Sequence, residues 1–258
     1  MAETATATVN KPVWIDLASS NAEASRAFYS RLFGWQVEPS PDPQYGGYAI
    51  ARVEGRDVAG IGPKMSADAP DAWSLYIGTS DADETARAVE AAGGTVVAPP
   101  FDVGDQGRMA VFRDPSGAFI SAWQGTRMGG FQTDAPGSFG WSELNARGVD
   151  RAITFYTDVF GWKTRTSEMG EGQPPYTEFL LDGESIAGAW EMNAMVPAGV
   201  PSYWQIYFAV ADVDAAFRAA VAAGAREMVA PRDFPGGRFA ILTDPQGASF
   251  GLLRVSPR

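Results

Sequence analysis

The sequence contains no cysteine and no histidine among its 258 residues. Without cysteine, a disulfide, a thiolate nucleophile and a cysteine-based zinc site are all excluded. Without histidine, no imidazole can bind a metal ion or transfer a proton near pH 7. Lysine is scarce and occurs at Lys11, Lys64 and Lys163. These absences leave carboxylates and tyrosines as the main groups for acid–base chemistry.

Long apolar runs are absent as well. No segment approaches the ~18–20 apolar residues that cross a bilayer, and residues 1–10 have neither the basic nor the apolar region of a signal peptide. We therefore expect a disordered tail over residues 1–10, a cytoplasmic protein and no membrane partner. The net charge of −11 argues against nucleic acid as a partner, because phosphate binding needs a basic surface. The excess of acids also serves solubility.

The sequence repeats itself after about 130 residues, which indicates two duplicated modules rather than a solenoid. The matched segments are Trp14–Leu17 with Trp141–Leu144, Phe28–Trp35 with Phe155–Trp162, Asp81 with Asp212, and Asp114–Ala118 with Asp244–Ala248. We place the first module at residues 11–124 and the second at 139–258, joined by a polar, glycine-rich linker over 125–138.

Apolar periodicity and turn residues predict the order β-α-β-β-β twice in each module. Asn21 and Asp81 are predicted helix N-caps, and Gly34 is a predicted helix end. The expected helices cover 22–32, 82–92, 149–160 and 213–223. The expected strands cover 13–17, 36–38, 48–53, 58–63, 73–79, 95–98, 108–113 and 119–124, then 140–144, 176–181, 186–192, 203–210, 238–243 and 249–254.

This element order, with Phe-Tyr and Gly-Trp around the end of the first helix and Asp-Pro-x-Gly before the last strand, resembles the vicinal oxygen chelate superfamily. That superfamily includes glyoxalase I, extradiol dioxygenases and bleomycin-resistance proteins. The chain is most similar to two-module glyoxalase-like proteins, often labelled hydroxylases. The resemblance implies an α+β fold of tandem βαβββ modules whose mixed sheets curl into ligand-binding cups. Because fold does not fix chemistry, it says less about function.

The resemblance also places the family's three metal-ligand positions in each module. They hold Trp14, Ser74 and Ser121 in the first module, and Trp141, Gln205 and Gly251 in the second. Iron, zinc and nickel need three or four converging nitrogen, sulfur or carboxylate donors. Neither set supplies them, so we expect no metal site and no cofactor.

Strand alternation predicts which side chains line the cups. The two acids Asp16 and Glu143 share a face with the tryptophans at the first ligand position, and they are the candidate catalytic bases. The candidate ligand-binding residues are mostly aromatic: Trp14, Tyr48, Tyr76, Trp123, Trp141, Tyr176, Glu178, Tyr203, Gln205, Tyr207, Arg108 and Arg238. An apolar pocket with few polar groups suits a small, flat organic ligand.

Each of these residues also has a structural interpretation. Trp14 and Trp141 could plug the vacated metal site as core residues. Trp35, Trp73, Trp162 and Trp204 are expected in the core. Asp16 and Glu143 would either pair with an arginine, with Arg108 and Arg238 as candidates, or have a raised pKa suited to a general base.

Three functions remain open. The first is a metal-independent enzyme on an aromatic or polycyclic metabolite, with Glu143 or Asp16 as base and Tyr207, Tyr76 or Gln205 orienting the substrate. The second is a binding or sequestration protein that holds a planar ligand without chemistry. The third is a scaffold with a packed cup. A metal-dependent dioxygenase or glyoxalase is the least favoured, and the chain is expected to be a monomer or a homodimer.

Overall fold

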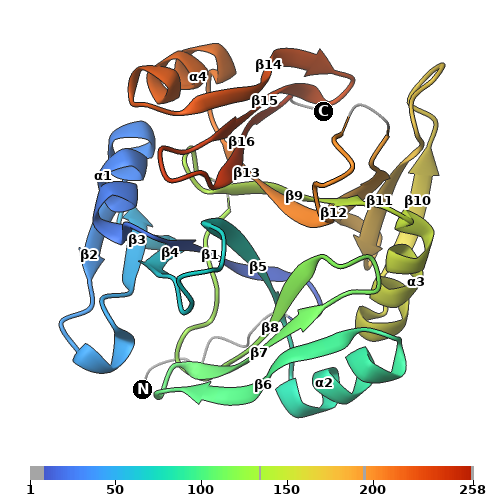
Figure 1. The fold of residues 1–258 in the computed structure, drawn as a ribbon, viewed down its shortest axis with the longest axis horizontal. Coiled ribbons are helices and arrows are strands. Elements are labelled where there is room, and N and C mark those ends of the chain that lie inside the picture. Colours follow the sequence, from blue (N-terminus) through green and yellow to red (C-terminus); the bar gives the residue numbers. More distant parts are fainter. Residues whose placement is uncertain (1–8, 134, 194–195, 257–258) are drawn as a thin grey trace. The chain divides into compact units, whose positions relative to one another are not determined.

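The computed structural model describes residues 9–133, 135–193 and 196–256 (Figure 1). Most of the predicted tail, residues 1–8, lies outside the described residues. Both modules contain β-α-β-β-β twice, in the predicted order. The predicted α+β class with two tandem mixed-sheet modules is therefore confirmed. No helix in the described ranges is long and apolar enough to cross a membrane.

The first module runs from β1 to β8 and includes two α-helices and one short 3-10 helix. Its elements are β1 (Pro12–Ser19), α1 (Ala22–Phe33), β2 (Gln36–Pro39), η1 (Pro43–Tyr45), β3 (Ala49–Val53), β4 (Arg56–Pro63), β5 (Ala72–Gly78), α2 (Ala82–Ala91), β6 (Thr95–Val103), β7 (Gly107–Arg113) and β8 (Phe119–Gly125).

The second module repeats this order from β9 to β16. Its elements are β9 (Phe139–Ala146), α3 (Val149–Phe160), β10 (Lys163–Ser167), β11 (Tyr176–Leu181), β12 (Glu184–Glu191), β13 (Tyr203–Ala209), α4 (Val213–Ala222), β14 (Arg226–Phe234), β15 (Gly237–Thr243) and β16 (Ser249–Val255).

Each module forms one eight-stranded mixed sheet. The strand orders are β2-β3-β4-β1-β5-β8-β7-β6 and β10-β11-β12-β9-β13-β16-β15-β14, so the second sheet repeats the first strand for strand. Strand β1 runs parallel to β4, and β9 runs parallel to β12 in the same way. The duplication seen in the sequence is therefore a duplication of sheet topology.

Local side-chain chemistry sets the helix ends. Asn21 caps α1 by accepting the Ala24 N–H at 3.1 Å, and Asp81 caps α2 through the Glu84 N–H at 2.8 Å. Gly34 ends α1 with φ of 72°, a left-handed conformation that glycine adopts without steric cost. The predicted caps are confirmed.

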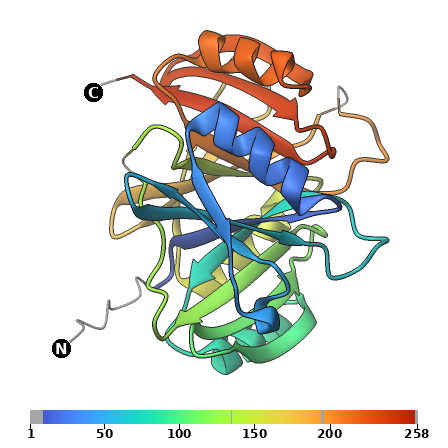
Figure 2. The same cartoon turned by 90° about the vertical axis from the view of Figure 1, so that its left-hand side faces the viewer.

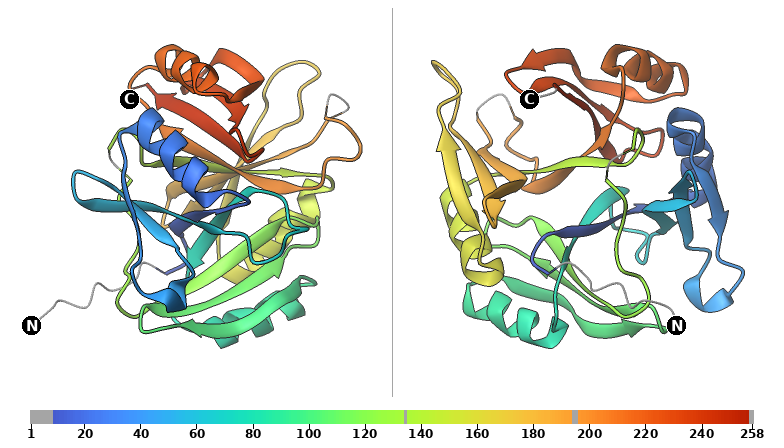
Figure 3. Two further views of the ribbon diagram at one scale, coloured as in Figure 1. Left: turned by 60° about the vertical axis from the view of Figure 1, so that its left-hand side comes forward. Right: turned by 180° about the vertical axis from the view of Figure 1, so that it is seen from behind.

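The described residues divide into two compact units, and each unit combines parts of both modules. The first unit contains the chain up to Val13, Leu75–Gly130 and Ser142–Trp204. It includes helices α2 and α3, which contact each other (Figure 3). The second unit contains Trp14–Ser74, Phe131–Trp141 and Gln205–Arg258. It includes helices α1 and α4, which also contact each other (Figure 2).

A buried tyrosine joins the two modules within the second unit. The Tyr29 hydroxyl donates to Asp244 Oδ2 at 3.1 Å and accepts the indole N–H of Trp73 at 3.0 Å. Asp244 Oδ1 accepts the backbone N–H groups of residues 246–248 at 2.8–2.9 Å. The aspartate of the Asp-Pro-x-Gly turn in the second module is thus fixed to the first helix of the first module.

The first unit contains the reciprocal arrangement. Tyr156 donates to Asp114 Oδ2 at 2.9 Å and accepts the Trp204 indole N–H at 2.8 Å. Asp114 Oδ1 accepts the N–H groups of residues 116–118. Tyr156 also stacks on Trp162, with ring centroids 5.4 Å apart. The four tryptophans predicted for the core, Trp35, Trp73, Trp162 and Trp204, are all buried.

The Tyr29–Asp244 bond can be tested by Tyr29→Phe, which leaves a buried indole N–H and a buried carboxylate oxygen each without this partner. We expect the free energy of unfolding to fall by about 1.5–3 kcal/mol, measured by urea denaturation. Tyr45→Phe on η1 is the matched control and should change it by less than about 0.5 kcal/mol. Equal losses in the two variants would contradict a specific role for this bond.

The same variant gives a pH-dependent prediction. Burial raises the pKa of Asp244, whereas its backbone N–H bonds and Tyr29 act to lower it. A raised pKa means that the native state binds the proton more tightly than the unfolded state. This contribution is therefore full below an ordinary aspartate pKa of ~3.9 and is lost as pH rises through the native value. Because Tyr29 favours the anion, the stability deficit of Tyr29→Phe should shrink between pH 7 and pH 4. A constant deficit would contradict this.

Candidate functional site

The first strand of the first module places a hydrogen-bonded chain of three predicted site residues in the second unit. The indole N–H of Trp14 donates to the Tyr48 hydroxyl at 2.8 Å, and this hydroxyl donates to Asp16 Oδ2 at 3.3 Å. Trp14 and Asp16 are two positions apart on β1, so both side chains lie on one face of the strand. The structure thus brings together the predicted acid and two predicted aromatic residues.

Glycine makes room for this chain. In the sheet register Gly60 of β4 lies opposite both Asp16 of β1 and Ile50 of β3. A Cβ at Gly60 would lie 1.8 Å from the Tyr48 hydroxyl, so Tyr48 reaches Asp16 by crossing β4 over a bare backbone. Gly62 serves the same ring, because its Cβ would lie 2.9 Å from Tyr48 Cδ2.

The Tyr48 hydroxyl is a donor by virtue of its surroundings. Burial raises the pKa of Tyr48 well above the usual value near 10, and the charge of Asp16 raises it further. The phenol therefore keeps its proton even at a pH near 10, where an ordinary tyrosine begins to lose it, and directs this proton at the carboxylate. This bond fixes the orientation of the Asp16 carboxylate.

The second module repeats the acid, the tyrosine and the glycine within the first unit. Gly188 of β12 lies opposite Glu143 of β9, and its Cβ would lie 1.9 Å from the Tyr176 hydroxyl. Tyr203 is half-buried, and burial followed by the charge of Glu143 raises its pKa to about 12. Glu143 thus lies within electrostatic reach of Tyr203, a residue whose counterpart in the first module is Ala72.

Trp14 fits the structural interpretation of a plug. It is 2% exposed, its indole N–H is satisfied by Tyr48, and its ring lies 6.3 Å from that of Phe131 in a stacked arrangement. Trp123 is likewise buried and donates to the Met128 carbonyl at 3.0 Å. Trp141 is half-buried. Trp14 and Trp123 therefore act mainly as packing residues.

Other predicted site residues have defined surroundings. Tyr76 and Tyr207 are buried at matching places, opposite Ser121 and Gly251 in their parallel strand pairs. Glu178 forms a bidentate ion pair with Arg165 at 2.8 and 2.9 Å on the neighbouring strand β10, and it also accepts from Ser185.

Arg108 and Arg238, the candidate arginine partners of the two acids, pair with other carboxylates. Arg108 pairs with Asp83 of α2 and with Asp102, and Arg238 pairs with Asp214 of α4 and with Asp233. Their place in the sheet explains these partners. Arg108 lies opposite Gln124, whose side chain accepts the Ala82 N–H at the start of α2, so this face is the helix side of the sheet.

The positions at which the resemblance places metal ligands do not fit a metal. The Trp14 nitrogen carries a hydrogen that it donates to Tyr48. Gln205 Oε1 accepts from Ser249 at 2.6 Å, and a Cβ at Gly251 would lie 2.1 Å from the Tyr207 ring. Among the described residues no cluster of three or more Asp or Glu side chains could hold a metal ion. We therefore derive no step through a metal.

The sequence interpretation overlooked the glycines. Gly60 and Gly188 occupy matching strand positions in the two modules, each directly beneath a tyrosine hydroxyl. Glycine inside a strand often marks a close approach by another group. Its recurrence in both copies was the signal that a tyrosine side chain crosses the strand at this position.

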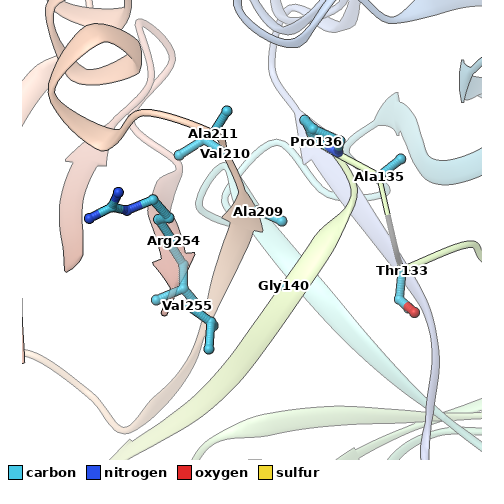
Figure 4. A pocket seen from close by; sticks show the side chains of 10 residues that line it. Thr133, Ala135, Pro136, Gly140, Ala209, Val210, Ala211, Arg254 and Val255 are labelled. Carbon is cyan, nitrogen blue, oxygen red and sulfur yellow. The ribbon is translucent and has the colours of Figure 1, made fainter. Parts of the chain in front are cut away.

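A pocket of about 340 Å³ lies elsewhere in the second unit, near the ends of β13 and β16 (Figure 4). Its walls include Pro136, Gly140, Ala209 and Leu253, and none of the predicted ligand-binding residues. Small apolar side chains dominate the walls in Figure 4, with Arg254 and Thr133 as the polar exceptions. The walls offer few groups that could orient a ligand.

Comparison with known proteins follows the same two modules. Residues 11–121 and 138–252 match the model of the Glyoxalase/Bleomycin resistance protein/Dioxygenase superfamily. CFP32, a candidate glyoxylase of Mycobacterium tuberculosis (strain CDC 1551 / Oshkosh), is 39% identical over 254 residues, covering 96% of this chain and 95% of CFP32. The anthracycline biosynthesis protein DnrV of Streptomyces peucetius is 36% identical, covering 95% of this chain and 93% of DnrV.

Two solved structures share the fold. The Mn(II)-bound glyoxalase from Novosphingobium aromaticivorans has a TM-score of 0.65 at 17% identity, covering 95% of this chain and 82% of the other. The 2,3-dioxygenase LapB from Pseudomonas sp. KL28 has a TM-score of 0.66 at 14% identity, covering 96% and 93%. At these identities the likeness concerns the fold alone.

The proton on Tyr48 can be followed directly. Because its pKa is raised, this residue should contribute no phenolate at pH 10, where an ordinary tyrosine is about half ionised. The ultraviolet phenolate absorbance of the wild type and of Tyr48→Phe should therefore be equal at pH 10. A lower absorbance in the variant would contradict a protonated donor.

The glycine beneath Tyr48 gives a packing test. Gly60→Ala places a methyl group against the Tyr48 ring, and we expect a loss of about 1–3 kcal/mol in the free energy of unfolding. In a Tyr48→Ala background the same change should cost less, because the clashing ring is gone. Gly199→Ala, which meets open space, is the control. Equal costs of Gly60→Ala in both backgrounds would contradict the proposed packing.

Proposed function

Because the chain belongs to the Glyoxalase/Bleomycin resistance protein/Dioxygenase superfamily, we propose that it binds a planar aromatic small molecule and acts on it without a transition metal. The observation that carries the proposal is the hydrogen-bond chain from Trp14 through Tyr48 to Asp16. This hydrogen-bond chain begins with a donor, the Trp14 indole, at the position where the resemblance places a metal ligand. It ends on the Asp16 carboxylate.

The proposed chemistry is proton transfer by the two acids. Asp16 and Glu143 would accept a proton from an acidic C–H or O–H group of the ligand. Tyr48 is a positioning residue that holds the Asp16 carboxylate through its hydroxyl. In the second module, Tyr203 lies within electrostatic reach of Glu143 and would orient the ligand there.

Two kinds of support favour an aromatic ligand. The predicted site residues Trp141 and Tyr203 are half-buried aromatic side chains, and stacking on such rings contributes about 0.5–1.5 kcal/mol per pair. The relative DnrV is named for anthracycline biosynthesis, and anthracyclines contain fused, planar rings. A ligand of this shape suits the aromatic character of both modules.

Binding without chemistry is the second candidate. The specific observation behind it is that the Asp16 carboxylate already accepts a hydrogen bond from Tyr48. Such a pair also serves a purely structural purpose, since a half-buried carboxylate needs hydrogen-bond partners. A sequestration protein would retain the aromatic surface and leave its ligand unchanged.

The experiment combines binding with product analysis. Purified protein is treated with a strong chelator, titrated with substituted anthraquinones by tryptophan fluorescence quenching, and incubated with those that bind before mass spectrometry. We expect binding that survives chelation, and turnover that falls at least tenfold in Asp16→Asn combined with Glu143→Gln. Asp68→Asn combined with Glu184→Gln, two exposed acids, is the matched control.

Each contrary result has a distinct meaning. Binding that is lost with the chelator and restored by Mn²⁺ or Fe²⁺ would overturn metal independence. Turnover that is unchanged in the double acid variant would overturn the role of Asp16 and Glu143. A ligand recovered unchanged after long incubation would establish the binding function instead.

A further inference from the structure

The sheet formed by β13–β16 in the second unit has two different faces. Arg238 pairs with Asp214 of α4, so its side chain lies on the helix-covered face. The next residue, Phe239, lies opposite Leu253 in the β15–β16 register and faces the other way. Tyr207 shares this second face, because its ring lies 6.3 Å from that of Phe239 in an edge-on arrangement.

An arginine adjoins these aromatic rings. The Arg232 guanidinium lies 6.0 Å from the centre of the Phe239 ring, and the two residues are direct partners in the β14–β15 register. Phe234 meets Phe239 edge-on at 5.9 Å. Met228, four residues before Arg232 on the same strand, is 52% exposed and accepts a hydrogen bond from Ser249 at 3.7 Å. The face thus offers accessible apolar surface next to one cation.

Arg232 differs from its neighbour Arg238 in its partners. Arg238 is held by two carboxylates at 2.7 and 2.9 Å. Arg232, in contrast, makes no ion pair with any described residue, although the chain carries 31 acids against 20 basic residues. It is exposed, and its guanidinium lies over the Phe239 ring. An arginine over a ring presents its N–H groups to a carboxylate or phenolate in solution.

The first module provides an internal comparison. Arg232 and Phe239 correspond in the repeat to Phe101 and Met109, which are also direct partners in their register. The aspartates that follow, Asp102 and Asp233, both pair with the helix-side arginine. The two copies therefore retain the structural ion pair and differ at the neighbouring pair on the opposite face. The cation belongs to the second module alone.

The geometry points to Arg232 as the residue that makes the second unit, which also contains Asp16, selective for an anionic aromatic ligand. The ring system would lie against Phe239, and a carboxylate or phenolate on it would accept hydrogen bonds from the guanidinium. The first unit, with Phe101 at the matching place, would not distinguish the anionic ligand from its uncharged form. This inference deepens the proposed function and rests on it.

The test uses two probes with the same rings, anthraquinone-2-carboxylate and anthraquinone-2-carboxamide. Isothermal titration of the full chain at low salt should show the carboxylate binding about tenfold more tightly than the carboxamide. Arg232→Gln should reduce this preference to about twofold or less and leave carboxamide binding unchanged, with Arg232→Lys in between. Arg218→Gln on α4 removes the same charge from an exposed helix position and should keep the full preference.

The outcomes separate this inference from the function on which it rests. If neither probe binds the wild type, the proposed aromatic-ligand function fails. If both bind with equal affinity, or if Arg232→Gln keeps the preference for the carboxylate, only the role of Arg232 is overturned. Because Arg232 is exposed, circular dichroism of each variant should match the wild type. If Arg232→Gln unfolds, Phe239→Leu takes its place. This change removes the ring beneath the guanidinium and should also weaken the preference for the carboxylate over the carboxamide.

Discussion

The fold depends on two buried tyrosine–aspartate hydrogen bonds that cross between the modules. Each aspartate begins an Asp-Pro-x-Gly turn, where one oxygen accepts three backbone N–H groups and the other accepts a tyrosine hydroxyl from the other module. A hydrogen bond to a buried charged group contributes about 1.5–3 kcal/mol. Because each module supplies one tyrosine and one aspartate, neither module completes its own buried network. Each compact unit is therefore built from segments of both modules.

This interlocking constrains the modules at some positions and leaves others free. The residues that build the bonds, Tyr29 with Tyr156 and Asp114 with Asp244, are identical in the two copies. The glycines beneath Tyr48 and Tyr176 are retained as well, because a side chain there would collide with the ring. On the open sheet face, by contrast, Phe101 corresponds to Arg232. The two copies thus keep the residues that hold the sheets together and differ at this neighbouring position.

Sequence alone predicted the element order because both copies carry the same caps, turns and apolar alternation. It missed β10 and β14, since β10 is exposed at every residue and β14 at most of them, so neither shows an apolar alternation. It offered Arg108 and Arg238 as partners of Asp16 and Glu143 because they lie on adjacent strands, whereas each arginine pairs with a helix carboxylate and with a carboxylate of the neighbouring strand. The Tyr48–Asp16 bond was not predictable from spacing, since the Tyr48 side chain reaches Asp16 only because Gly60 of β4 has no side chain.

Trp14 occupies a position at which the resemblance places a metal ligand, and its indole sets the direction of the hydrogen bonds around it. A coordinating side chain offers a lone pair, whereas the Trp14 indole can only donate a hydrogen. The donated hydrogen needs an acceptor, and the Tyr48 hydroxyl supplies one while directing its own hydrogen onward to Asp16. Both hydrogen bonds therefore run in the same direction, from the indole to the carboxylate. The strand position at which the resemblance places a metal ligand therefore holds, in this chain, the first donor of a hydrogen-bond chain that ends on the Asp16 carboxylate.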